Sequence, residues 1–308
     1  MGPWSVRSAP ASITWDVIVR AVGAGYRLGM MTTMTMPTPT KPVGELLREW
    51  RERRRLSQLS LALEADVSAR HLSFLETGRS RPSREMLLRL AERLGIPPRE
   101  RNTLLLAAGF APAYAERGLD DPALRAARRA VDRVLAGHEP FPALAVDRHW
   151  TLLAANRAVG PLLAGVGPDL LRPPVNVLRL SLHPDGLAPR IANLPRWRAH
   201  LLDRLRHQVE VTADPVLAHL ADELRGYAIP GGDQGEPTSG DVLAGVAVPL
   251  LLRTEQGILA FLSTTMVFGT PVDVTLTELA VEAFFPADDA TAAALSRTAE
   301  GWKGAPGT

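Results

Sequence analysis

Residues Ser57–Ser83 read SQLSLALEADVSARHLSFLETGRSRPS, and they carry the clearest structural pattern in the chain. Apolar side chains recur there at helical spacing, at Leu61, Ala62, Ala65, Val67, Leu72 and Leu75. Ser57 and Ser68 each precede a helical run, where a hydroxyl can accept a hydrogen bond from a free N–H group of the first turn. The stretch therefore predicts two short helices joined by a tight turn, which is a helix-turn-helix.

This region resembles the helix-turn-helix domain of Xre/lambda-repressor-type regulators over residues 43–110. The resemblance rests on Ser57-Gln58, LALEADVS at 61–68 and HLSFLETGRSRPS at 71–83, with MLLRLAERLGI at 86–96 as a fourth helix. It implies an all-α domain over residues 41–110 whose second helix enters the major groove of duplex DNA. Aspartate occupies the turn at Asp66, where relatives most often carry glycine, and aspartate tolerates a left-handed backbone better than most residues.

The resemblance also assigns roles to individual side chains. Arg70 is expected to read a base, because a guanidinium can donate two hydrogen bonds to guanine. Arg79 and Arg81 are expected to contact phosphate. Phe74 has two interpretations, contact with a thymine methyl or packing against the following loop, and both stay open. The complete set of expected DNA-binding residues is Gln58, Ser68, Ala69, Arg70, His71, Ser73, Phe74, Arg79 and Arg81.

Two further features of this domain carry expectations. Arg51 lies where relatives carry an arginine that pairs with the glutamate closing the second helix, here Glu76, so the resemblance implies a structural ion pair. Leu59 and Leu63 lie where relatives more often have polar residues. They are either ordinary surface leucines or a docking face for the second domain or a dimer partner.

The rest of the chain resembles the MmyB-like, PAS-related ligand-binding domain of a group of bacterial regulators. The resemblance rests on PPRERNTLLLAAGFAPAYAER at 97–117 and FPALAVDRHWTLLAANRA at 141–158. It implies an α+β, PAS-like domain over residues 119–296, with an antiparallel sheet covered by helices, joined to the first domain by a linker at 111–118.

The sequence of this second region predicts its elements in order. We expect a helix over 122–136, a β-hairpin of 141–146 and 150–155, and mostly helix over 187–226. A polar, glycine-rich loop follows at 231–240, and strands are expected over 242–253, 257–268 and 276–285. The tail is expected to be a short helix that gives way to disorder over 297–308.

The resemblance implies that this domain holds a small apolar ligand such as a fatty acid. The expected pocket residues are Trp197, Leu201, Phe261, Met266 and Phe268, with Arg190 or Arg198 available for a carboxylate at the mouth. The alternative is that the apolar side chains form an ordinary filled core. The domain would then be only a dimerisation or interaction scaffold without a ligand.

Composition agrees with a DNA-binding protein and excludes several other classes. The net charge is only +2, but residues 41–110 hold 14 Lys and Arg against 9 Asp and Glu. The absence of cysteine excludes disulfides, thiol catalysis and cysteine-bound metals. No apolar run approaches the ~20 residues that span a bilayer, and the absence of cysteine fits a reducing cytoplasm, so a cytoplasmic protein is expected. A homodimer is expected because one helix-turn-helix module buries little DNA surface and a symmetric dimer reads two half-sites about one helical turn apart. Residues 1–40 are expected to be a disordered leader or an upstream mis-called start, with Met30, Met31, Met34 and Met36 as alternatives.

Catalytic and metal-binding patterns are weak. The sequence has no HExxH, GxSxG or P-loop motif, and GAGYRLG at 23–29 has no strand before it or helix after it. His200, Asp203 and His207 have helical spacing, but no third strong ligand accompanies the two histidines. The chain is therefore expected not to be an enzyme and to have neither a metal nor a cofactor.

Overall fold

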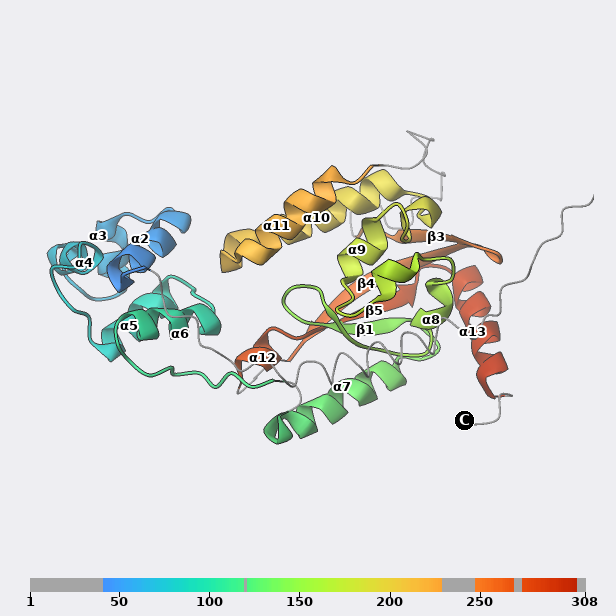
Figure 1. The fold of residues 1–308 in the computed structure, drawn as a ribbon, viewed down its shortest axis with the longest axis horizontal. Coiled ribbons are helices and arrows are strands. Elements are labelled where there is room, and N and C mark those ends of the chain that lie inside the picture. Colours follow the sequence, from blue (N-terminus) through green and yellow to red (C-terminus); the bar gives the residue numbers. More distant parts are fainter. Residues whose placement is uncertain (1–40, 119–120, 229–246, 269–272, 304–308) are drawn as a thin grey trace, which may run out of the picture.

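The computed structural model describes residues 41–118, 121–228, 247–268 and 273–303, and the leader at 1–40 and the loop at 231–240 lie outside them. Two lobes follow one another along the chain, a helical one and one built around a sheet (Figure 1). The predicted fold class, an all-α helix-turn-helix domain followed by an α+β domain, is confirmed. Among the described residues, no helix is both long enough and apolar enough to cross a membrane.

The helical lobe contains the expected turn between two capped helices. Ser57 Oγ accepts the N–H of Ser60 at 3.0 Å, and Ser68 Oγ accepts the N–H of His71 at 3.1 Å. Between the helices Asp66 adopts a left-handed backbone with φ 53°. The five helices are α2 (Val43–Arg53), α3 (Gln58–Glu64), α4 (Ala69–Glu76), α5 (Arg84–Arg93) and α6 (Pro98–Ala107).

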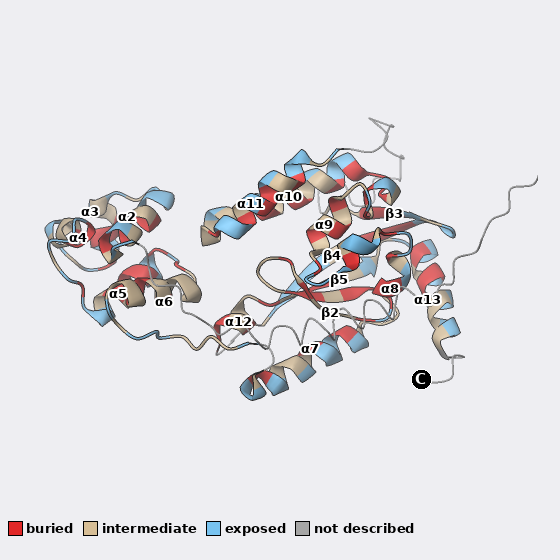
Figure 2. Cartoon of the chain, in the orientation of Figure 1, coloured by how far each residue is buried: buried red, intermediate tan, exposed pale blue. Residues whose placement is uncertain are grey.

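The core of this lobe is closely packed, as the buried inner faces of its helices show in Figure 2. Helix α2 lies directly against the end of α4 at Gly44. A Cβ atom there would lie 2.2 Å from the carbonyl oxygen of Leu75, so only glycine fits without moving the backbone. Leu47, Leu61 and Leu72 are completely buried among the surrounding helices. The close packing of these helices therefore fixes the position of α4 within the lobe.

The second lobe is built on one antiparallel sheet with strand order β2-β1-β5-β4-β3. In β4, Thr265 pairs with Glu282 of β5 and Met266 pairs with Val281. Neighbouring residues of a strand face opposite sides of the sheet, so these two pairs belong to different faces. The strands are β1 (Ala143–Val146), β2 (Leu152–Ala155), β3 (Leu250–Thr254), β4 (Gly257–Val267) and β5 (Ala280–Pro286).

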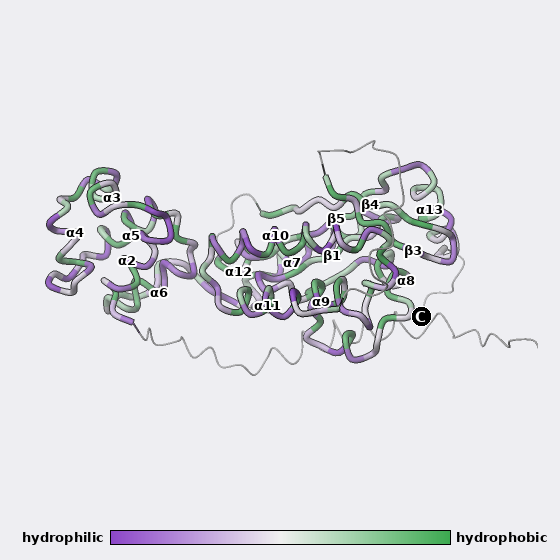
Figure 3. Tube along the Cα trace, turned by 90° about the horizontal axis from the view of Figure 1, so that it is seen from above, coloured by the Kyte–Doolittle hydropathy of each residue, from purple (hydrophilic) through white to green (hydrophobic). Residues whose placement is uncertain are grey.

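Helices cover both faces of the sheet (Figure 1). One face packs against α9 (Val177–Leu182), α10 (Leu194–Thr212) and α11 (Pro215–Gly226), and the other against α7 (Arg125–Gly137). Figure 3 shows hydrophilic and hydrophobic residues alternating along α10, as expected for a helix with one buried side. The remaining elements are η2 (Pro122–Leu124), α8 (Val159–Leu162), η3 (Pro168–Leu171), η4 (Ala188–Arg190), α12 (Val274–Thr277) and α13 (Asp289–Lys303).

Three sequence predictions of local structure were wrong. Within the described part of the strand expected over 242–253, strand β3 begins only at Leu250. The strand expected from residue 276 begins only at Ala280, because α12 forms first and Asp273 caps it by accepting the N–H of Thr275 at 2.9 Å. The tail expected to be disordered from residue 297 is helical as far as Lys303 within α13. The Arg157 guanidinium lies 5.4 Å from the Trp302 ring, which gives this last turn a tertiary contact.

Candidate functional site

The exposed side of α4 carries an aromatic ring between two cations. The Arg70 guanidinium lies 5.4 Å from the centre of the Phe74 ring, and the Arg79 guanidinium lies 6.0 Å from it. Arg70 and Arg79 are exposed, whereas Phe74 is half-buried. Of the two interpretations of Phe74, this geometry favours packing within the domain, because the ring supports both guanidinium groups.

The other residues expected to contact DNA are Gln58, Ser68, Ala69, His71, Ser73 and Arg81, and Gln58 differs from the rest because its side chain bonds within the domain. Ser68 and Arg81 are exposed, while Ala69, His71 and Ser73 are half-buried on α4. Gln58 uses its side chain inside the domain, where Nε2 donates to Glu76 Oε2 at 2.8 Å. Leu59 and Leu63, whose role the sequence left open, are 61% and 74% exposed on α3.

The structure brings Arg51 and Glu76 together in a buried, two-pronged ion pair. Arg51 Nε donates to Glu76 Oε1 at 2.7 Å, and Nη2 donates to Oε2 at 2.8 Å. A third donor, Arg51 Nη1, bonds to the carbonyl of Leu56 at 2.9 Å. The hydrogen bond with Glu76 raises the pKa of Arg51 despite the opposing effect of burial. The pair joins α2 to the end of α4 and so holds the exposed side of α4 in place.

The α+β lobe contains an apolar cavity of about 100 Å³ between the sheet and helices α9 and α10. Three of the expected residues, Trp197, Leu201 and Phe261, line it. The Trp197 indole is fixed in the wall, because its Nε1 donates to Ser181 Oγ at 3.0 Å. Most of the remaining lining is aliphatic, from Leu144, Leu152, Val159, Leu162, Leu163, Val177, Leu178, Leu180, Leu187, Leu250 and Leu252.

Four residues that the sequence placed at this pocket do not line it. Met266 and Phe268 are an odd number of positions from Phe261 along the chain, so they face the opposite side of the sheet, where Phe268 packs beside α7. Arg190 instead donates to the carbonyls of Leu162 and Ala164 at 2.9 and 2.7 Å. Arg198 donates to the carbonyls of Leu224 and Arg225 at 3.1 and 2.6 Å. These arginines serve as structural donors to backbone carbonyls.

The charged groups of the cavity are Arg204 and Glu282, which the sequence analysis missed. Arg204 Nη1 donates to Glu282 Oε2 at 3.0 Å and Nη2 donates to Oε1 at 2.5 Å. The same guanidinium lies 4.6 Å from the centre of the Trp150 ring. Arg204 follows Trp197 by seven positions, which is two helical turns, so helical spacing indicates the arginine. No sequence signal indicates its partner, 78 residues further along the chain.

A second cavity of about 300 Å³ lies between the two lobes and shares a wall with the apolar one. Trp150, Arg204 and Glu282 line both cavities. Trp150 has a left-handed backbone with φ 65°, which is uncommon for a bulky residue, and its Nε1 donates to Gln208 Oε1 at 2.8 Å. The turn before β2 therefore carries a side chain that separates the two cavities.

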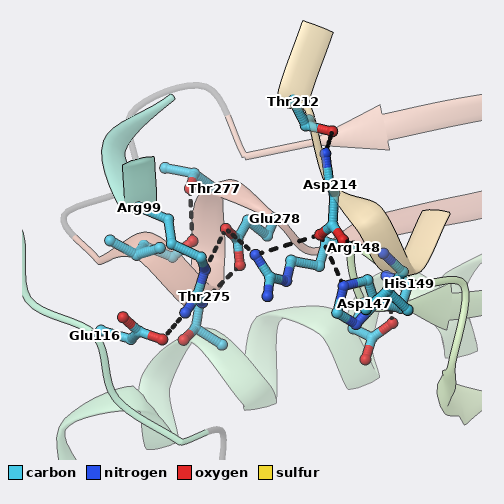
Figure 4. Close-up of polar contacts among 12 residues, drawn as sticks. Arg99, Glu116, Asp147, Arg148, His149, Thr212, Asp214, Thr275, Thr277 and Glu278 are labelled. Carbon is cyan, nitrogen blue, oxygen red and sulfur yellow. Dashed lines mark hydrogen bonds and ion pairs between the residues drawn. The ribbon is translucent and has the colours of Figure 1, made fainter. Parts of the chain in front are cut away.

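The residues immediately before Trp150 belong to a network of charged groups (Figure 4). His149 Nε2 lies 2.9 Å from Asp214 Oδ2, and Arg148 Nη1 lies 3.6 Å from the same oxygen. Arg148 Nη1 also lies 3.8 Å from Glu278 Oε1. Burial alone would raise the pKa of Asp214, but the hydrogen bonds from His149 and the Val216 N–H, and the charge of Arg148, lower it to about 2. Asp214 is therefore the anionic centre of this network.

The network continues into the helical lobe through Arg99 of α6 (Figure 4). Arg99 Nε and Nη2 donate to the two carboxylate oxygens of Glu278 at 2.8 Å each, and Arg99 also pairs with Glu116. A second link comes from Arg54, at the end of α2, whose Nη2 donates to the carbonyl of Val211 near the end of α10 at 3.2 Å. The favourable placement of a cation at a helix C-terminus strengthens this link.

One carboxylate at the same junction behaves differently. Burial, with a smaller contribution from the charge of Glu278, raises the pKa of Glu100 to about 7, against a backbone hydrogen bond and the charges of Arg148 and Arg99. Glu100 belongs to α6 and lines the cavity between the lobes. The junction thus contains one carboxylate that is charged near pH 7 and one that is about half protonated there.

A helix-turn-helix lobe joined by ion pairs to an α+β lobe with an apolar cavity defines a DNA-binding transcription regulator with a ligand-binding domain. Comparison with known families agrees with this class. Residues 47–101 match the helix-turn-helix family, and residues 127–297 match the MmyB-like transcription regulator ligand binding domain. Because the second match spans more than half of the chain, the chain belongs to the MmyB-like transcription regulators. This confirms the resemblance found in the sequence; no match was found among curated proteins.

Proposed function

We propose that the protein is a sequence-specific regulator that changes its DNA binding when a small apolar ligand occupies the cavity of the α+β lobe. The observation that carries this proposal is the shared wall of Trp150, Arg204 and Glu282 between the apolar cavity and the cavity at the lobe junction. A ligand that moves this wall also moves the turn that carries Arg148 and His149. That turn reaches the DNA-binding lobe through Glu278 and Arg99.

The proposed mechanism is a shift in population between arrangements of the two lobes. The ion pairs at the junction favour one arrangement in the absence of ligand. Occupancy of the cavity favours another by displacing Trp150 and weakening the contacts of Arg148 with Asp214 and Glu278. The ligand changes DNA affinity only as far as it binds the two arrangements with different affinities.

We propose further that two copies of the chain bind DNA together in the cytoplasm. A single helix-turn-helix buries little DNA surface, whereas a symmetric dimer reads two half-sites about one helical turn apart. Leu59 and Leu63 of α3 form an exposed apolar pair on the DNA-binding lobe. In this proposal the exposed side chains of Arg70, Arg79 and Arg81 supply the positive charge that faces the DNA. Arg70 is the proposed base reader, and Arg79 and Arg81 the proposed phosphate contacts.

Native mass spectrometry of the purified protein, followed by denaturing extraction and lipid analysis, tests the proposal. A dimer that carries extra mass, released as an apolar compound such as a fatty acid, is the expected result. The alternative, a scaffold whose second domain only dimerises, predicts a dimer free of added mass that also binds no apolar compound when one is supplied. That outcome would contradict the ligand-sensing function and leave DNA binding untouched.

A further inference from the structure

The second half of strand β4 has an open edge. Strand β3 begins at Leu250, opposite Phe261, and β4 runs past it towards α12 (Figure 1). Over residues 262–267, β5 is therefore the only strand among the described residues that pairs with β4. Met266 and Val267 are 40% and 66% exposed, so this part of the strand is open to solvent.

The register of the sheet shows which backbone groups point out of this edge. Ala287, directly after β5, donates its N–H to the carbonyl of Ala260 at 2.8 Å, so the backbone groups of Ala260 point towards β5. Successive residues of a strand turn these groups to opposite sides, and β4 pairs with β5 without a shift from 261 to 267. Within the described parts of the chain, the outward groups of this stretch have no hydrogen-bond partner. They are the N–H and C=O groups of Ser263, Thr265 and Val267.

The described chain turns away before it could cover this edge. In a longer β3, Val248 would lie opposite Ser263, but residues 247–249 are not part of the strand. The carbonyl of Pro249 instead accepts a hydrogen bond from Asn193 Nδ2 at 2.8 Å. The backbone before β3 is thus held away from β4.

The two outer strands of the sheet differ from this edge. Ala192 donates its N–H to the carbonyl of Leu251 on the outer side of β3, at 2.7 Å. Leu152 of β2 donates its N–H to the carbonyl of Val175, also at 2.7 Å. The chain therefore bonds its own segments to both outer strands, whereas no described segment bonds to the edge at 263–267.

The sequence of the open edge lacks the features that keep edge strands apart. Residues 262–268 read LSTTMVF, without a charged residue or a proline, and the pairing with β5 contains no bulge. Edge strands of soluble proteins are usually interrupted by a lysine, a proline or a bulge, because a bare edge pairs with another strand. An uncharged edge meets no like charge on a copy of itself. A second copy of this chain is therefore the partner that fits it.

Two copies of this edge complement one another. The strands can run antiparallel about a twofold axis that places Thr265 opposite Thr265 of the second copy. Ser263 of each copy then lies opposite Val267 of the other. Opposing residues of this kind exchange both of their N–H···O bonds, so every outward group of the edge gains a partner.

We infer that two copies of the chain associate by pairing β4 with β4 over residues 263–267, which joins the two α+β lobes into one continuous antiparallel sheet. The inference deepens the proposed function and rests on it, because it gives the location of the proposed dimer contact. The twofold axis places the two DNA-binding lobes in symmetric positions, as inverted half-sites require. The paired edge ends at Val267, which also lines the cavity at the lobe junction, so the dimer contact adjoins the links to the DNA-binding lobe.

Introduced cysteines test this register directly, because the chain has no cysteine of its own. Thr264 and Met266 are exposed, and in the inferred dimer Thr264 of one copy lies opposite Met266 of the other. The Cα atoms of such a pair are about 4.5 Å apart, which suits a disulfide. The full-length Thr264→Cys/Met266→Cys variant is therefore expected to form a disulfide-linked dimer on mild oxidation.

The two single variants are the matched controls, because neither places two cysteines opposite one another. An equimolar mixture of Thr264→Cys and Met266→Cys chains is expected to cross-link, whereas each variant alone is expected to stay unlinked. If each single variant cross-links as readily as the mixture, random collisions explain the product and the inference fails.

Sedimentation equilibrium of the unaltered protein separates this inference from the proposed function. A dimer that forms normally but does not cross-link in the double variant has its contact elsewhere, for example at Leu59 and Leu63. That result overturns the inference and leaves the proposed dimer intact. A protein that stays monomeric at every concentration, with and without duplex DNA, contradicts both.

The variant Val267→Pro tests the backbone pairing. The N–H of Val267 points out of the edge and takes no part in the ladder with β5, so proline removes a donor that only the dimer uses. The dissociation constant of the dimer is expected to rise at least about tenfold, and Val267→Ala, which keeps the N–H, is expected to change it little. An unchanged dissociation constant in Val267→Pro overturns the inference. A loss of thermal stability in the monomeric variant also overturns it, because residues 242–246 of the same chain would then occupy the edge.

Discussion

The two lobes bury arginine–glutamate pairs of similar geometry in interiors of different kinds. Ten leucine and isoleucine side chains of the smaller helix-turn-helix domain are at most 1% exposed, whereas among the described leucines, isoleucines and phenylalanines of the larger α+β domain only Leu205, Leu224, Leu252 and Phe261 are. The Arg51–Glu76 pair is surrounded by this filled core, whereas the Arg204–Glu282 pair borders a cavity. The interior of the DNA-binding domain, which presents a fixed surface to DNA, is filled with side chains. The interior of the ligand-binding domain contains a cavity.

The largest expected effect is the loss of the pair in the filled domain. Glu76→Ala leaves Arg51 with one backbone acceptor and a long ion pair, 3.8 Å, to the exposed Glu52, in a site where the arginine side chain is 10% exposed. We expect the free energy of unfolding of this domain to fall by about 3–5 kcal/mol. Scanning calorimetry of the variant measures the loss.

Glu210→Ala provides the control for that change. Glu210 pairs with Arg206 four residues earlier on the same helix, and both side chains are more than half exposed. No measurable loss of stability is expected from this exposed pair. If both variants lose the same stability, the packed interior contributes nothing to the importance of the Arg51–Glu76 pair.

The second prediction tests the difference in packing between the domains. Leu72→Phe adds volume to a completely filled site and is expected to lower the free energy of unfolding by about 1–3 kcal/mol. Leu178→Phe adds the same atoms at a side chain that lines the cavity, so a loss below about 1 kcal/mol is expected. Chemical denaturation of each variant gives both values.

A third substitution shows whether the small loss expected at Leu178 comes from the cavity or from the α+β domain as a whole. Leu205 is completely buried on α10 and does not line the cavity, so Leu205→Phe is expected to behave like Leu72→Phe. Equal losses for Leu178→Phe and Leu205→Phe would show that the cavity closes in solution. The contrast between a filled and an unfilled domain would then be wrong.

The sequence predicted the filled domain better than the unfilled one for a physical reason. Helical spacing and N-caps are local, so Ser57, Ser68 and the buried leucines could be placed from the sequence alone. The cavity depends on contacts between distant elements. The period of two along β4 was available to separate Phe261 from Met266, but nothing local indicates that Arg204 faces Glu282 across 78 residues.

The third prediction concerns the two arginines on either side of Phe74. Arg70→Ala is expected to lose about 1–3 kcal/mol of binding free energy on the preferred duplex and to relax sequence preference, because Arg70 is the proposed base reader. Arg79→Ala is expected to weaken binding to all sequences alike. It should also make the slope of log affinity against log salt concentration less steep, by the amount that about one phosphate contact contributes. Duplexes selected from a random library, titrated at several salt concentrations, supply the measurements.

These two variants control for one another, because each removes a cation beside the same ring. Loss of the ring contact alone would affect them equally. If Arg70→Ala weakens binding to selected and scrambled duplexes equally, Arg70 is not a base reader. If Arg79→Ala keeps the salt dependence of the unaltered protein, Arg79 does not contact phosphate.

The most gradual expected effect is a pH dependence of stability that comes from two carboxylates at the lobe junction, whose pKa values move in opposite directions. The pKa of Asp214 is lowered to about 2, so its stabilising contribution is complete above about pH 4 and is lost as the pH falls towards 2. The pKa of Glu100 is raised to about 7, so the folded protein binds a proton that the unfolded chain releases. Stability therefore falls between about pH 4.5 and pH 7, by less than about 1.4 kcal/mol per pH unit.

Substituting each carboxylate by its amide separates the two contributions. In Glu100→Gln the free energy of unfolding should no longer fall between about pH 4.5 and pH 7, because the group that loses its proton is gone. In Asp214→Asn that fall should remain, and the rise between about pH 2 and pH 4 should become smaller; the rest of the rise comes from groups such as Glu223, whose pKa the hydrogen bond with Arg179 also lowers to about 2. Urea unfolding at a series of pH values measures both slopes. A Glu100→Gln profile parallel to that of the unaltered protein would place Glu100 in water, and the junction would then hold its ion pairs without a desolvated acid beside them.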